Sequence, residues 1–275
     1  MRISRLLLPF GASVVSAAAA KTASNSYALV DSYDATNFLS EFSFFTGADP
    51  TCGFVDYQEK SAANKSGIAG YVNGAVYLGV DHITKNPVGG RNSVRVTSNK
   101  AYTHGLIIAD IPHMPGGICG TWPAFWTYGP NWPHSGEIDI VEGVNAQSAN
   151  AVTLHAAEGC SLDGTGSMAS SKLASTACTP NDGCKMQTAD PLNYGVAFNA
   201  AGGGVYAMEW TSSFISVHFF SRGLIPADIK AGKPNPASWG APVARFSGSG
   251  CDIDSHFSQQ SIVFNTDFCG QVSFR

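Results

Sequence analysis

The chain has 275 residues, of which only 13% are charged, and its net charge at neutral pH is −4. This balance, without any cluster of lysine and arginine, argues against a nucleic acid or an anionic membrane as the partner. Aromatic residues make up 11% of the chain, and Gly, Ser, Thr and Asn are abundant. We therefore expect a neutral ligand, with no nucleic-acid partner and no membrane partner.

The first twenty residues have the pattern of a secretory signal peptide. Two arginines open the chain, an apolar run extends from Leu6 to about Val15, and Ala18–Ala20 form a small-residue cleavage site. A membrane anchor is the alternative, but Pro9 and Gly11 interrupt a run that is too short to span a bilayer. We predict a signal peptide at residues 1–20 and one domain at residues 21–275, because all-β domains of this size are commonly single.

The body of the chain alternates apolar and polar residues at a period of two, which is typical of half-buried strands. Thr211–Ser213 separates two such runs and predicts a hairpin. Gly- and Pro-rich segments separate the other runs, and no amphipathic helix longer than two or three turns is expected. The pattern indicates an all-β sandwich or barrel, with strands at 75–80, 93–97, 152–155, 205–210 and 215–220.

The segment from Gly136 to Gly143 carries three carboxylates in apolar, β-branched sequence. Strand alternation sends Glu137 and Asp139 to one face, but it would send Glu142 to the core. One β-bulge near 140–141 restores Glu142 to the face of the other two. We therefore predict a bulged strand with three acids on one side. A solvated strand face and a calcium site are the alternatives.

Such a strand suits the cleavage of a glycosidic bond. One carboxylic acid must protonate the leaving oxygen while a second carboxylate acts at the anomeric carbon. Direct attack by the second, with the carboxyls about 5–5.5 Å apart, gives a covalent intermediate and retained configuration. Trp122, Trp126 and Trp132 precede the acids, among Gly and Pro. They fit sugar-stacking platforms, although single tryptophans in all-β proteins are more often core residues.

Seven cysteines follow the predicted signal peptide, and in a secreted chain they indicate disulfides. Zinc is the alternative, but no C-x-x-C pair and no His/Cys cluster at ligand spacing occurs, so we predict no metal. Because the count is odd, at least one cysteine must lack a partner in this chain. The stretch from Cys160 to Cys184 has no obvious strand and predicts a surface loop pinned by a disulfide.

These features resemble glycoside hydrolase family 16, in particular the fungal endo-1,3(4)-β-glucanases, or laminarinases. The resemblance extends from about Tyr27 to Gly270. The E-x-D-x-x-E spacing matches the laminarinase and lichenase branches rather than the xyloglucan branch. Its other motifs include Gly90–Arg95, Gly120–Trp126, Thr153–His155, Tyr206–Trp210 and Asp267–Gly270.

The resemblance implies a curved, concanavalin-like β-jelly-roll sandwich with a concave substrate cleft, in which residues 21–275 form the catalytic domain. It implies retaining hydrolysis of β-1,3 or mixed β-1,3/1,4 glucans, with Glu137 as nucleophile, Glu142 as general acid/base and Asp139 as the assisting carboxylate. It implies no cofactor, a β-glucan polysaccharide as the partner, a monomer, and an extracellular, cell-wall-associated location. The positions that match substrate-binding ones are Arg95, Trp122, Trp126, Trp132, His155 and Glu209, with Tyr57 as a weaker candidate.

Two other functions fit the same sandwich: a cell-wall transglycosylase and a non-catalytic β-glucan-binding protein. The presence of both Glu137 and Glu142 disfavours the binding protein. The sequence also departs from the family pattern after Cys269–Gly270, where the family continues with a further segment that contains the last strand. From this departure we predict a C-terminally incomplete domain of reduced stability with at least one unpaired thiol, Cys269 being the candidate.

Overall fold

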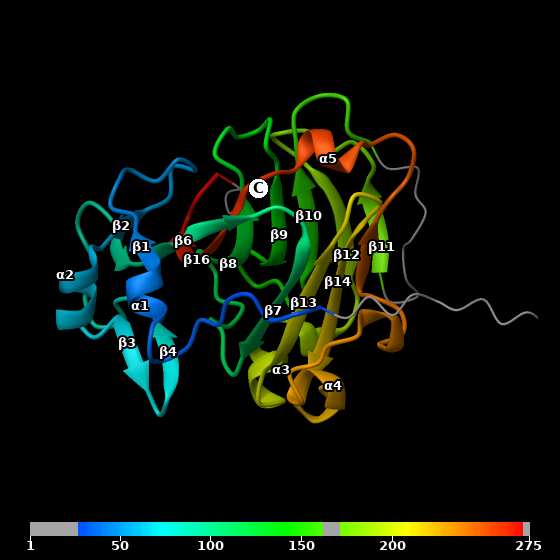
Figure 1. Ribbon diagram of the computed structural model, residues 1–275. Coiled ribbons are helices and arrows are strands. Elements are labelled where there is room, and N and C mark those ends of the chain that lie inside the picture. Colours follow the sequence, from blue (N-terminus) through cyan, green and yellow to red (C-terminus); the bar gives the residue numbers. More distant parts are fainter. Residues whose placement is uncertain (1–26, 162–170, 272–275) are drawn as a thin grey trace, which may run out of the picture.

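A computed structural model of the protein describes residues 27–161 and 171–271. Two antiparallel sheets form its centre (Figure 1). The predicted signal peptide and the predicted truncation after Gly270 concern segments that lie, wholly or mostly, outside the described residues. The larger sheet contains, in spatial order, β1 (Phe42–Phe44), β6 (Arg95–Tyr102), β16 (Gln260–Phe268), β8 (Thr121–Tyr128), β9 (Glu137–Glu142), β10 (Ala151–His155), β12 (Cys184–Thr188) and β11 (Ser171–Ser175).

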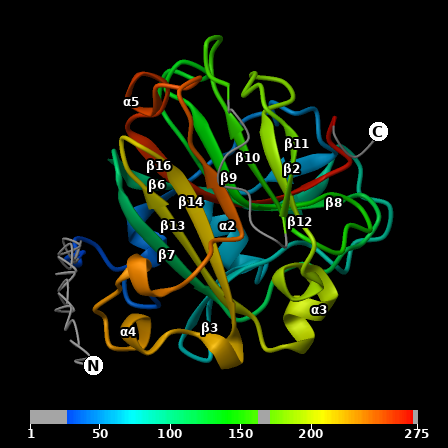
Figure 2. The same cartoon turned by 90° about the vertical axis from the view of Figure 1, so that its right-hand side faces the viewer.

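The second sheet has four strands and packs against the larger one. In Figure 2, β13 and β14 lie on one side of the molecule, and β11 and β12 lie on the other. Two small sheets complete the strands: β2 (Val55–Tyr57) pairs with β5 (Arg91–Ser93), and β3 (Ala69–Val72) pairs with β4 (Ala75–Leu78). The four strands are β15 (Ala244–Phe246), β14 (Ile215–Ser221), β13 (Gly204–Trp210) and β7 (Gly105–Ile111).

The helices are short, as the sequence predicts. The longest described ones, α2 (Lys60–Lys65) and α3 (Gly195–Ala200), have six residues each. No helix of the described residues has the length and apolar character needed to cross a membrane. The others are α1 (Phe38–Glu41), α4 (Ala227–Lys230), α5 (Ile253–His256) and the 3-10 turns η1 (Pro191–Asn193), η2 (Arg222–Leu224) and η3 (Pro236–Ser238).

The core lies between the two sheets and follows from the period-two pattern. From β9, Ile138 and Ile140 are fully buried, and from β13 Tyr206, Met208 and Trp210 face them across the sandwich. Each such apolar side chain contributes about 1.5–3 kcal/mol by leaving water. The all-β sandwich predicted from the sequence is confirmed, as is the hairpin at Thr211–Ser213, which joins β13 to β14.

The region of the cysteines differs from the prediction. Residues 171–175 lie in a stretch that we expected to be a loop, but they form strand β11. They do so because they pair with the edge of β12 that β10 leaves free. Two disulfides form, Cys160–Cys251 and Cys178–Cys184, so a disulfide does pin this region. All seven cysteines lie in the described residues, and Cys52, Cys119 and Cys269 are unpaired. The prediction of an unpaired Cys269 is confirmed, and two more thiols join it.

Candidate active site

The acidic strand β9 contains the predicted bulge. Glu142 pairs with Ala124 of β8, and Asp139 pairs with Trp126. Three positions on β9 therefore span two on β8, and the same shift recurs against β10. The extra residue lies at 140–141, where it changes the alternation once. Because Ala124, Trp126 and Tyr128 share one face of β8, their partners Glu142, Asp139 and Glu137 also share one face, which we call the acid face.

Indole N–H groups hold the two outer carboxylates. Trp122 donates from Nε1 to Glu142 Oε1 at 2.8 Å, and Trp132 donates to Glu137 Oε2 at 2.6 Å. Hydrogen bonds to a charged acceptor are stronger than neutral ones and fix the orientation of the carboxylate. The Trp132 side chain is also 46% exposed, so its ring remains accessible from solvent. Two of the three predicted tryptophans thus contact the acids directly.

Asp139 lies between the two glutamates and is 2% exposed. Its Oδ2 is 3.3 Å from Nε2 of His155, an ion-pair distance without the alignment of a good hydrogen bond. His155 pairs directly with Glu137 across β9 and β10. One side-chain atom from each of Glu137, Asp139 and His155 lies within 4.8 Å of the other two. The structure therefore brings His155, a predicted substrate-binding residue, into the acid cluster.

The charges in this cluster shift one another's protonation. Burial, and then the negative charge of Asp139, raises the pKa of both Glu137 and Glu142. Burial alone would lower the pKa of His155, but Asp139 and the two glutamates outweigh it and raise the pKa to about 9. Like charges this close cannot all ionise near neutral pH, so the pair of glutamates retains a proton. That is the proton content that acid-assisted bond cleavage requires.

A cation could in principle also be held by Glu137, Asp139 and His155, whose side-chain atoms are close enough. A protonated imidazole has no lone pair to offer a metal, and the raised pKa of His155 favours that form. Glu137 already accepts the Trp132 N–H. The arrangement suits proton transfer better than metal binding.

Arg95 and Trp126 form the neighbouring part of the acid face. A cross-strand row runs from Arg95 through Asn265 and Ala124 to Glu142. The Arg95 guanidinium lies 4.9 Å from the Trp126 ring centroid, a cation–π distance. Trp126 donates from Nε1 to Asn265 Oδ1 at 2.7 Å. The row therefore places a cation and a fixed aromatic ring beside the carboxylates.

The geometry can be compared with known families. The model of the XgeA-like catalytic domain of glycoside hydrolase family 16 matches residues 42–274 of the chain. The chain belongs to glycoside hydrolase family 16. The expected resemblance is thereby confirmed, and the acid face lies within the matched domain.

Curated relatives of this family 16 chain include fungal proteins. An endo-1,3(4)-β-glucanase of Arthroderma benhamiae is 46% identical over 92% of this chain and 57% of its own length. A probable endo-1,3(4)-β-glucanase of Aspergillus niger is 45% identical over 98% of this chain and 37% of its own length. The chain thus spans between about a third and three fifths of these relatives.

Solved structures of family 16 share the fold closely. Laminarinase 16A from Phanerochaete chrysosporium, described with β-glucans in its donor and acceptor sites, gives a TM-score of 0.86 at 42% identity. It covers 90% of this chain and 86% of its own. An elongating family 16 β-1,3-glucosyltransferase gives a TM-score of 0.85 at 45% identity, over 90% of this chain and 84% of its own.

One predicted substrate-binding residue of the family 16 chain, Glu209, does not lie on the acid face. Glu209 is on β13 in the four-stranded sheet, where Met208 and Trp210 face the core and Glu209 therefore faces away from it. Its carboxylate accepts the Tyr27 hydroxyl at 2.8 Å. Tyr57 is only 3% exposed, and its hydroxyl accepts a hydrogen bond from Asn265 of the acid-face row at 3.2 Å. The prediction that Glu209 contacts substrate at the acid face is therefore wrong, and the one for Tyr57 stays a prediction.

Other residues of the site were not found from the sequence. Asn265 links the Trp126 indole to the Tyr57 hydroxyl, to which its Nδ2 donates at 3.2 Å. Phe45 packs beside the Arg95 guanidinium, with 5.0 Å between the guanidinium carbon and the ring centroid. Asn265 is one of several polar residues of β16, so its place in the sequence did not distinguish it. No local pattern marks Phe45, which is distant in sequence from the acids.

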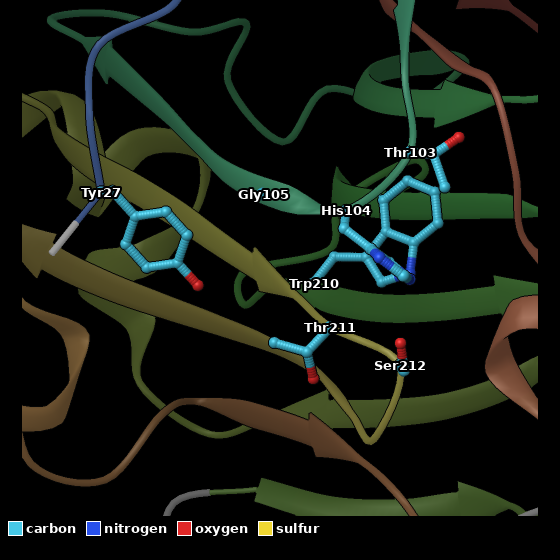
Figure 3. Close-up of a pocket in the computed structure, with 7 residues that line it drawn as sticks. All are labelled: Tyr27, Thr103, His104, Gly105, Trp210, Thr211 and Ser212. Atoms are coloured by element: carbon cyan, nitrogen blue, oxygen red, sulfur yellow. The ribbon is translucent and has the colours of Figure 1, made fainter. Parts of the chain in front are cut away.

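A separate pocket of about 480 Å³ lies where the turn from β6 to β7 approaches the turn from β13 to β14 (Figure 3). The rings of His104 and Trp210 meet edge to face there, 5.3 Å between centroids. None of the catalytic or substrate-binding residues predicted from the sequence lines this pocket, and it is distinct from the acid face. Its lining comprises Tyr27, Thr103, His104, Gly105, Trp210, Thr211 and Ser212.

Proposed function

We propose that the chain is a retaining endo-glucanase that hydrolyses β-1,3 or mixed β-1,3/1,4 glucans. The observation that carries this proposal is the acid face, where two glutamates held by indole N–H groups flank a buried aspartate. The relatives named endo-1,3(4)-β-glucanases support the substrate class. Polysaccharides of this kind are extracellular, so we propose secretion as well, with the enzyme acting as a monomer on β-glucan of the cell wall.

In the proposed mechanism Glu137 is the nucleophile and Glu142 the general acid/base. Glu142 protonates the leaving oxygen while Glu137 attacks the anomeric carbon and forms a glycosyl ester. Glu142 then removes a proton from water, which attacks the same carbon and releases Glu137, so the configuration is retained. Asp139 lies beside both carboxylates, so its charge sets how tightly the pair holds its proton. No cofactor takes part, because the side chains supply both the nucleophile and the proton.

The tryptophans and Arg95 would hold the sugar. A pyranose ring presents an apolar C–H face, and the exposed Trp132 ring offers a matching surface. The Trp126 ring is fixed by Asn265 and by the Arg95 guanidinium, so little freedom is lost when a sugar packs on it.

The roles of the acids are tested with substrates that differ in leaving group. Glu142→Gln should nearly abolish laminarin hydrolysis but spare the glycosylation step on aryl β-glucosides, whose leaving groups need no proton. Glu137→Ala should block both substrates, and azide should restore part of the activity. Glu158→Gln, at an exposed position beyond β10, serves as the control. Equal loss on both substrates in Glu142→Gln would exclude its role as the acid.

A second activity, glycosyl transfer, is favoured by one specific observation. The glucosyltransferase described above is as similar to this chain as the laminarinase. In both reactions the glycosyl ester on Glu137 forms first, and only the acceptor differs: water or a sugar hydroxyl. Laminarin, lichenan and xyloglucan should be assayed in parallel, with and without laminari-oligosaccharides, and the products sized. Products longer than the substrate would indicate transfer, and absence of any change in chain length would indicate a binding protein.

A further inference from the structure

The loop between β11 and β12 is closed by the disulfide Cys178–Cys184, whose cysteines are six positions apart. Both cysteines are buried, at 1% and 0% exposure. The backbone ties the loop to the end of β10, because Ala156 donates its N–H to the Cys178 carbonyl at 3.0 Å. A loop this short and anchored at both ends has few alternative conformations. It is therefore a rigid support for whatever side chain it contacts.

That side chain is His155. Nδ1 of its ring lies 3.0 Å from the carbonyl oxygen of Pro180 and 3.3 Å from that of Thr179. A carbonyl oxygen can only accept a hydrogen bond, so Nδ1 must carry the proton in this arrangement. The loop thus selects the tautomer of His155 through two backbone groups that no side-chain substitution removes.

Gly183, also in this loop, leaves no room for a side chain beside the ring. It has a left-handed φ of +64°, and a Cβ built on it would lie 2.9 Å from His155 Cε1 and 2.4 Å from Thr153 Cγ2. Contacts that short do not occur between real carbon atoms, so only glycine fits here without displacing the ring. The His155 ring therefore packs closely against the loop that bonds to it, and a side chain at position 183 would displace Thr153, the ring or both.

The consequence appears at the other nitrogen. With Nδ1 protonated, a neutral imidazole would leave a bare Nε2 lone pair beside the buried Asp139 Oδ2, only 3.3 Å away. Two acceptors at that distance repel, unless a proton lies between them. We propose that the Cys178–Cys184 loop is a positioning element that keeps His155 protonated and ion-paired with Asp139, and that His155 serves as a positioning residue for the two glutamates. The kinetic part of this inference rests on the proposed function.

The charged groups nearest His155 are carboxylates, which favour its protonated form, and one lysine, which opposes it. Asp139 and Glu137 of β9 face it, and Glu142 lies behind them. Lys185 of β12 pairs with Thr153 and is the neighbouring positive charge. Asp182 of the loop is exposed. A proton on His155 therefore offsets part of the repulsion among three carboxylates, and its loss raises the pKa of the glutamate pair.

The test is an NMR titration of the full chain labelled with 15N-histidine. In the unaltered protein, His155 should show the proton on Nδ1 and titrate near pH 9. Gly183→Ala, and separately Cys178→Ala with Cys184→Ala, should lower that midpoint by at least about one pH unit, toward the ordinary value of about 6.5. Gly74→Ala is the matched control, with a φ of +76° and nothing within 4 Å of the added carbon.

Activity gives a second readout. In both loop variants the acid limb of kcat/KM against pH should move to higher pH, because a cation beside the carboxylates is lost. An unchanged His155 midpoint in the loop variants, or a neutral ring protonated on Nε2 in the unaltered protein, would overturn the inference. The tautomer is measured on the unaltered protein, so this test does not depend on the folding of any variant. If His155 behaves as expected while the protein cleaves no β-glucan, the proposed function fails and the positioning role stands.

Discussion

Asp267 offers a test of the fold that is independent of catalysis. It is 1% exposed, at the end of β16, where its carboxylate accepts hydrogen bonds from the Phe268 N–H at 2.6 Å and from the Thr51 hydroxyl at 3.0 Å. Burial, and then the nearby charge of Asp49, nevertheless raises the pKa of Asp267 from 3.8 to about 6. The folded protein therefore binds this proton more tightly than the unfolded chain does.

The magnitude follows from that difference. About 2 pH units between 3.8 and 6 correspond to about 3 kcal/mol, at 1.36 kcal/mol per unit. Because the folded pKa is the higher one, this contribution is fully present below about pH 4 and is lost as the pH rises through 6. Asp267→Asn removes the titration while keeping the shape. It should raise the free energy of unfolding by up to about 3 kcal/mol at pH 7 and change it little at pH 4.

Urea unfolding at several pH values between 4 and 7 measures the effect. Asp56→Asn, at an exposed position of β2 in the same region, is the control and should show no such pH dependence. A variant that is equally destabilised at every pH would show that the hydrogen bonds of Asp267 outweigh its charge, and the reasoning would be wrong.

Four further outcomes are expected. Trp126→Phe keeps the ring but loses the N–H bond to Asn265, so laminari-oligosaccharide binding measured by calorimetry should weaken by about 0.5–1.5 kcal/mol. Trp132→Ala should weaken that binding by about 1–3 kcal/mol with a smaller change in thermal stability, because the side chain is 46% exposed; severe unfolding with unchanged affinity would identify it as a core residue. Gly136→Ala places a Cβ 2.3 Å from Phe257 Cδ1 at a φ of +73°, so it should cost at least about 1–3 kcal/mol, and an unchanged Tm would contradict this. Titration of the denatured, unreduced protein with a thiol reagent should find three free thiols per chain, whereas a count of one would reveal a third disulfide.

The acidic strand shows how far the sequence alone could be taken. The alternation of strand residues predicted that Glu137 and Asp139 share one face. A bulge was then required for Glu142 to share that face, and the pairing of β9 with β8 contains it. Both inferences rest on the alternation of one strand, which is a local property. The same local reasoning identified β13 and β14 and the hairpin between them.

The errors concern which surfaces meet in the fold. Glu209 follows the alternation of β13 correctly, but alternation does not say which sheet a strand joins, and β13 joins the sheet without the acids. The strand β11 lies in a Ser- and Ala-rich stretch whose pairing is decided by β12 rather than by its own composition. The network of Asn265 with Trp126 joins residues 139 positions apart, a distance that no motif spans.

The position of β16 has a consequence for the order in which the molecule can assemble. This strand is the last one described along the chain, yet it lies between β6 and β8 rather than at an edge. During synthesis β6 and β8 leave the ribosome well before β16, which lies between them. Until β16 arrives, one edge of each strand has unpaired backbone groups. Contacts at such sequence separation form slowly, and the exposed edges invite pairing with other chains meanwhile. Folding yield should therefore depend strongly on protein concentration and on chaperones that shield these two strands until residue 268 is available.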